Sequence, residues 1–125
     1  MEQQSNKTVS IVHDGSLTEE EALNALRVAA QSATESLPAA LAQCKTQDDK
    51  NKVQADRDMV VLAYLNSLKK SLINTSSQFE KVAEDLETEA KAVKDKSTTL
   101  QNVSQAISLL SGLVQLAASL ALAFG

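Results

Sequence analysis

Hydrophobic positions in the second half of the chain recur at alternating spacings of three and four residues. Between Val61 and Phe124, one of the two columns of this pattern is apolar at every position. Its members are Leu65, Leu72, Phe79, Leu86, Val93, Leu100, Ile107, Val114 and Ala121. Such a seven-residue repeat is typical of α-helices that pack along one seam. Without a break it would form a rod of about 100 Å, at about 1.5 Å per residue, so an elongated coiled-coil rod is one hypothesis.

Local signals in the first half of the chain divide it into shorter elements. Thr18 and Glu21 have the spacing of a capping box, which predicts the start of a helix. Pro38 is expected to end or kink this helix, because proline lacks the amide donor and disfavours helix at the preceding residue. A strongly polar run at residues 47–52 predicts the next turn.

Two more capping signals interrupt the seven-residue repeat itself. Ser77 and Glu80 have capping-box spacing, and Ser97 or Thr98 is a further N-cap candidate. These breaks favour an antiparallel bundle with up-down packing over the rod. The four predicted helices cover residues 17–46, 49–74, 77–96 and 98–124.

Composition agrees with an all-α fold of one domain. The 125 residues include only three glycines, one proline, two phenylalanines and one tyrosine, so turn residues and aromatic strand formers are scarce. Residues 1–15 differ from the rest, with a short β-branched run before Asp14 and Gly15, and we expect a flexible N-terminal arm there. The helical bundle is expected to occupy residues 16–125.

The predicted last helix has no charge, since none occurs from Ser97 to Gly125. Its apolar window at residues 106–124 would span about 30 Å, the thickness of a bilayer core. Lysines at positions 91, 94 and 96 precede it, as in a membrane anchor. The helix is therefore expected to contact either lipid or other helices. We favour lipid in at least one state, because so short a chain has few elements to surround a helix.

A helical projection gives this segment two faces. The broad face is apolar and is the candidate for contact with a membrane or with other helices. Its members are Leu109, Leu110, Leu113, Val114, Leu116, Leu120 and Phe124. The narrow face is a stripe of small and polar residues, whose spacing of four lets another helix approach closely. This stripe consists of Ser104, Ser108, Gly112, Gln115 and Ser119.

Side chains that carry chemistry are few. The chain has one histidine, His13, and one cysteine, Cys44, so we expect no metal site and no cofactor. The carboxylates occur at helix starts, turns and charged helix faces, which does not suggest acid–base catalysis, and we expect no enzyme activity. The net charge of −4 and the scattered basic residues argue against nucleic-acid binding.

Two functional hypotheses follow. In the first, the C-terminal helix inserts into or anchors to a bilayer. This plan resembles the soluble forms of α-helical pore-forming toxins, and translocator or holin-type proteins, in architecture only and through no sequence motif. In the second, the chain is a soluble, oligomeric bundle or coiled-coil assembly subunit. Expected partners are membrane lipid or partner helices, including copies of the same chain. No N-terminal signal peptide is recognisable, which suggests a cytoplasmic or membrane-associated protein and leaves secretion without such a signal open.

Overall fold

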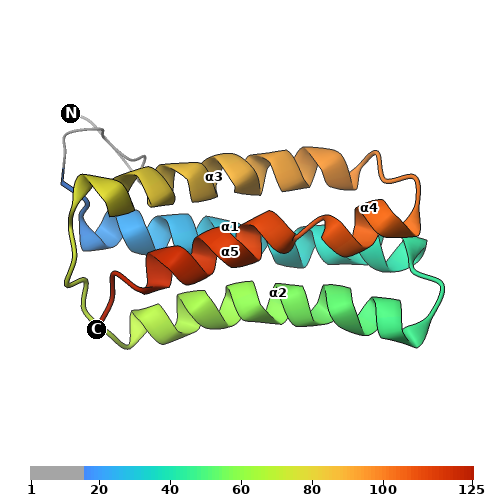
Figure 1. Cartoon of the computed structure of the whole chain (residues 1–125), viewed down its shortest axis with the longest axis horizontal. Coiled ribbons are helices and arrows are strands. Elements are labelled where there is room, and N and C mark those ends of the chain that lie inside the picture. The colour runs from blue at the N-terminus through green and yellow to red at the C-terminus, as the bar shows by residue number, and fades with distance from the viewer. Residues whose placement is uncertain (1–15) are drawn as a thin grey trace.

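The computed structural model describes residues 16–125, and the expected N-terminal arm at residues 1–15 lies outside this range. Within it the chain forms a bundle of helices and no strand, which confirms the all-α bundle (Figure 1). The helices are α1 (Glu19–Gln43), α2 (Gln47–Leu68), α3 (Ser77–Ser97), α4 (Val103–Ser108) and α5 (Ser111–Ala121). α4 and α5 follow one another and share the fourth position of the bundle. The rod hypothesis is wrong, because the chain reverses direction after α1, α2 and α3.

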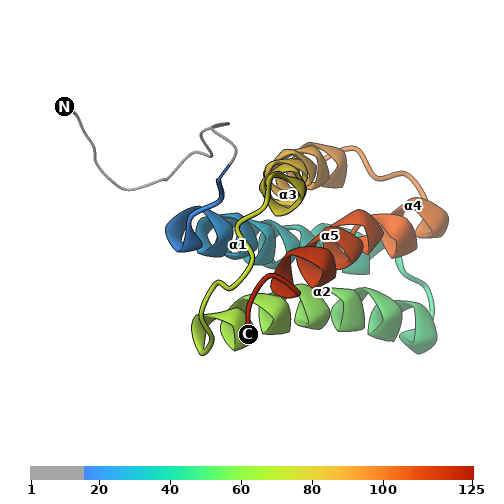
Figure 2. The ribbon, with the colours of Figure 1, turned by 60° about the vertical axis from the view of Figure 1, so that its left-hand side comes forward.

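Helices α2 and α3 lie at opposite corners of the bundle although they are consecutive in the chain (Figure 2). α1 packs against both of them, and so does α5 on the other side. Helix direction alternates along the chain, yet the diagonal step makes α1 parallel to its neighbour α3, and α2 parallel to its neighbour α5 (Figure 1). The helices therefore alternate in direction as predicted, but two of the pairs that lie side by side are parallel, which was not expected.

A segment at residues 69–76, here called the strap, carries the chain across the end of the bundle from α2 to α3. It pairs with the C-terminal tail. The Ser71 and Gly125 backbones exchange hydrogen bonds of 3.2 and 2.9 Å, and the Ile73 amide donates to the Ala123 carbonyl at 2.8 Å. These bonds explain why α2 ends at Leu68 rather than at residue 74, since the strap backbone pairs with the tail instead of continuing the helix.

The strap also binds the beginning of α1. The Leu17 amide donates to the Thr75 carbonyl at 3.1 Å, and the Leu72 amide donates to the Glu19 carboxylate at 2.9 Å. The start of α1, the end of α2 and the C-terminus are thus joined at one end of the molecule.

The boundaries of α1 and α3 test the capping predictions. The Thr18–Glu21 capping box is confirmed, with reciprocal bonds of 3.1 and 3.0 Å. Pro38 does not end α1, which continues through it to Gln43. The Ser77 box is wrong, because Ser76 occupies the N-cap and makes no side-chain capping bond.

The last helix differs most from its predicted range of 98–124. The Ser97 and Thr98 hydroxyls donate to carbonyls of the last turn of α3, at 2.7 and 2.8 Å, so they close that helix and cap no new one. Asn102 is the cap instead, and its side-chain oxygen accepts the Gln105 amide at 2.9 Å. A turn at residues 109–110 then separates α4 from α5.

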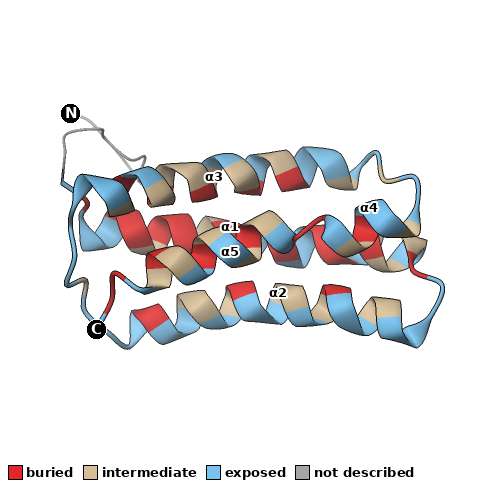
Figure 3. Cartoon of the chain, viewed as in Figure 1, coloured by how far each residue is buried: buried red, intermediate tan, exposed pale blue. Residues whose placement is uncertain are grey.

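The core combines an alanine-rich face of α1 with leucine and valine from the other helices. The fully buried alanines of α1 are Ala22, Ala25, Ala29, Ala33 and Ala40. The seven-residue column does not form one seam, since Leu86 and Val93 are buried while Leu65 is 43% exposed (Figure 3). Each reversal of the chain changes which side of the helix faces inward.

Candidate membrane-contacting segment

The fourth position of the bundle holds a segment that is long and apolar enough to cross a membrane. It runs over 19 residues, Val103–Ala121, and no other helix within residues 16–125 meets this test. As one continuous helix, at about 1.5 Å per residue, it would measure about 30 Å. The core helix of a bundle can share these properties, so the placement of its side chains matters.

The apolar face predicted from the sequence lies against the rest of the bundle. Its buried members are Leu109, Leu110, Leu113, Leu120 and Phe124, and its half-buried members are Val114 and Leu116. The structure thus brings these side chains together with α1, α2 and α3.

The polar stripe lies on the outside. Ser104, Ser108 and Gln115 are exposed, and Gly112 and Ser119 are half-buried. The Ser108 hydroxyl donates to the Ser104 carbonyl of its own helix at 2.9 Å. Within the described part of the chain the stripe therefore faces solvent.

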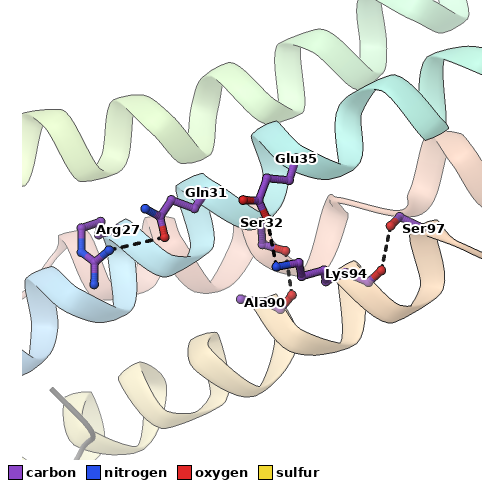
Figure 4. Close-up of polar contacts among 7 residues, drawn as sticks. All are labelled: Arg27, Gln31, Ser32, Glu35, Ala90, Lys94 and Ser97. Atoms are coloured by element: carbon purple, nitrogen blue, oxygen red, sulfur yellow. Dashed lines mark hydrogen bonds and ion pairs between the residues drawn. The ribbon is translucent and has the colours of Figure 1, made fainter. Parts of the chain in front are cut away.

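The side chains of Val103–Ala121 pack against the other three helices through apolar contacts. Within residues 16–125, the hydrogen bonds of its polar side chains stay inside the segment or reach its leading residues Gln101 and Asn102. The pairing of α1 with α3 is different (Figure 4). There the Ser32 hydroxyl donates to the Ala90 carbonyl at 2.6 Å, and Lys94 lies 3.1 Å from Glu35.

A polar pocket of about 600 Å³ adjoins the turn between α4 and α5. Glu89 of α3 and Gly112 of α5 form part of its wall. A Cβ atom at position 112 would lie 2.8 Å from a Glu89 carboxylate oxygen. Glycine therefore lets this carboxylate reach the start of α5, where the helix dipole favours a negative charge.

Within residues 16–125, six large aliphatic side chains outside the core are exposed, which the sequence analysis did not predict. Four lie on the second half of α2, and two lie where the strap meets the C-terminal tail. They are Met59, Leu62, Leu65, Leu68, Ile73 and Leu122. The sequence contains one signal for these exposed side chains, since no charged residue occurs from Met59 to Leu68. The helical pattern alone could not say which of these residues would face outward.

The described residues offer little other chemistry. Within residues 16–125, no group of three His, Cys, Asp or Glu side chains could hold a metal ion. The Cys44 thiol is buried and donates to the Ala40 carbonyl at 3.4 Å. His13 lies outside the described residues. In comparisons with protein-family models, curated proteins and solved structures, no match to this chain was found.

Proposed function

We propose that this is a membrane-active helical protein whose segment Val103–Ala121 leaves the bundle and inserts into a bilayer. The observation that supports this is the combination of bilayer length, complete lack of charge and side chains that pack on the bundle through apolar contacts. Release of such a segment breaks no ion pair. Hydrocarbon can replace the apolar contacts that the segment makes with the bundle.

The two faces of the segment suit two environments. In the bundle the leucine face is covered by protein and the Ser/Gly/Gln stripe meets water. In a bilayer the leucine face would contact lipid and the stripe would contact another helix, where Ser108 and Gly112 allow close approach. Gln115 needs a hydrogen-bond partner at that depth, which favours pairing of inserted segments. A pore-forming, translocator or holin-like role would each be a more specific version of this proposal.

The end of the bundle that carries the strap is a suitable first contact with lipid. Ile73 and Leu122 are 69% and 75% exposed there. Lys69 and Lys70 are exposed nearby and would meet the headgroups of anionic lipids. The tail that ends α5 is paired with this strap, so lipid contact at this end would act directly on the segment that inserts.

The test is Gln115→Arg, compared with Gln78→Arg as a matched control. Both glutamines are exposed, so both variants should fold as the wild type does, measured by circular dichroism. An arginine close to the centre of an inserted helix is unfavourable by about 2.5–3.5 kcal/mol. We expect Gln115→Arg to lose most dye release from vesicles containing anionic lipid, and Gln78→Arg to retain it.

Equal dye release by the two variants would contradict insertion of this segment. Leu113→Arg is a poorer test, because Leu113 is fully buried in the bundle and an arginine there would unfold the soluble form as well.

A soluble assembly subunit is the second candidate function. The exposed leucines of α2 favour it, because monomeric proteins rarely leave a row of aliphatic side chains open to water. A wild-type chain that neither floats with vesicles nor releases dye, yet stays folded at a defined oligomeric mass, would support this candidate instead.

A further inference from the structure

The outward face of α2 has a symmetric order of side chains. Asp58, Leu62 and Leu65 of α2 are followed by Lys69, the C-cap of α2 and the first residue of the strap. The spacings of four, three and four residues place all four along one side of the helix. We call these residues the outer row. Leu62 and Leu65 are 53% and 43% exposed, and the two charged residues are also exposed.

The outer row lies opposite the side that packs into the bundle. Val53, Val60 and Ser67 form that inner side and are almost completely buried. α2 lies at the edge of the bundle with its outer side away from the other helices (Figures 1 and 3). Within residues 16–125 the two leucines therefore keep about half of their surface open to solvent.

The outer row is complementary to itself when a second α2 runs antiparallel. Its spacing reads the same from either end, so Leu62 comes opposite Leu65 of the second helix. Asp58 then comes opposite Lys69 of the second helix. A parallel pair would instead place Asp58 against Asp58 and Lys69 against Lys69, which is unfavourable.

We infer that the outer row of α2 is the interface of an antiparallel homodimer with two-fold symmetry. Such an interface uses the same surface on both subunits, and each contact occurs twice. The leucines form its apolar centre, and the two Asp58–Lys69 pairs fix the antiparallel direction. Asp58 already lies 2.8 Å from Arg57 of its own helix, but its side chain keeps 60% of its surface exposed.

This inference is independent of membrane insertion. Segment Val103–Ala121 packs against α2 without covering the outer row, so the dimer can form while that segment is in place. A dimer that forms in a chain inactive on vesicles would leave the inference intact and would count only against the proposed function.

The first test measures the dissociation constant of the dimer by analytical ultracentrifugation. Asp58→Lys and Lys69→Asp each turn both charge pairs into like-charged pairs, so each should weaken the dimer on the order of tenfold. The double variant Asp58→Lys/Lys69→Asp exchanges the two charges and should restore most of the affinity. Asp95→Lys, at an exposed site on α3, is the control and should leave the dimer unchanged.

A second test uses cross-linking in a Cys44→Ala background. One chain carries Leu62→Cys and the other carries Leu65→Cys, and both positions are exposed, so the fold is preserved. An antiparallel pair predicts a disulfide that forms efficiently only when the two chains are mixed. A monomeric wild type, a dimer insensitive to the charge changes, or stronger cross-linking of Leu62→Cys to itself would each overturn the inference.

Discussion

At the scale of single residues, the polar groups between α1 and α3 are the most informative. Asn24 is buried, and its side-chain amide donates to a Glu87 carboxylate oxygen at 3.1 Å. Burial raises the pKa of Glu87, while the Asn24 hydrogen bond and the charge of Lys91 act in the opposite direction. The folded chain thus holds this proton more tightly than the unfolded chain does.

Glu87→Gln should therefore change the pH dependence of stability. As pH rises from the ordinary pKa of glutamate through the raised one, wild-type Glu87 loses its proton and the folded state loses stability. Glutamine resembles the protonated side chain and has no such loss. The free energy of unfolding of Glu87→Gln, measured in urea and taken relative to wild type, should therefore be higher near pH 7 than near pH 4. Glu20→Gln, at an exposed site, is the control, and an equal difference at both pH values would contradict the prediction.

At the scale of elements, the alanine face of α1 determines how closely the helices approach. Five of its alanines are fully buried, and α1 packs against both α2 and α3. Small side chains at a contact let two helices lie near the lower end of the usual range of 8–10 Å. The Ser32 hydroxyl donates to the Ala90 carbonyl of α3 at 2.6 Å, which agrees with a close approach of these two helices.

Ala29→Leu should consequently destabilise the bundle. Three further heavy atoms at a fully buried contact force the neighbouring helices apart, at a cost of about 1–3 kcal/mol. The free energy of unfolding in urea measures this loss. Ala42→Leu, at an exposed position near the end of α1, should change it by less than about 0.5 kcal/mol. A loss at position 42 as large as that at position 29 would contradict the close-packing argument.

At the scale of the whole molecule, the strap pairs with the C-terminal tail. This pairing ties the end of α5 to the connection between α2 and α3. The tail can leave the bundle only if its backbone bonds to the strap break. Because Ser71 and Gly125 exchange both hydrogen bonds, their Cα atoms have the separation that suits a disulfide. The three atoms nearest to a Cβ at Gly125 all belong to the exposed Ile73 side chain, which can move aside.

Ser71→Cys/Gly125→Cys in a Cys44→Ala background should therefore control insertion through redox state. When oxidised, the variant should gain about 2–4 kcal/mol of stability, measured by urea denaturation, and should lose dye release from vesicles. A reducing agent should restore dye release to the level of the Cys44→Ala chain. Equal dye release before and after reduction would contradict the requirement that the tail leave the strap.

Local sequence signals determined much of this fold. The scarcity of glycine and aromatic residues and the spacing of apolar positions were sufficient for an all-α bundle. The Thr18–Glu21 box gave the start of α1, because a cap depends on residues three positions apart. The uncharged segment was also visible, since charge and length do not depend on folding.

Only the tertiary structure decided what each helix face meets. The strap lies diagonally because residues 71–73 pair with a tail some fifty positions away, and this long-range pairing leaves no local pattern. The pairing ends α2 early. Leu62 and Leu65 lie outside because the opposite side of α2, with Val53 and Val60, packs into the bundle, although these leucines are as apolar as the buried Leu86. Periodicity determines that a helix has an apolar side. Which side is covered depends on the helices that pack against it and on the volumes of their side chains.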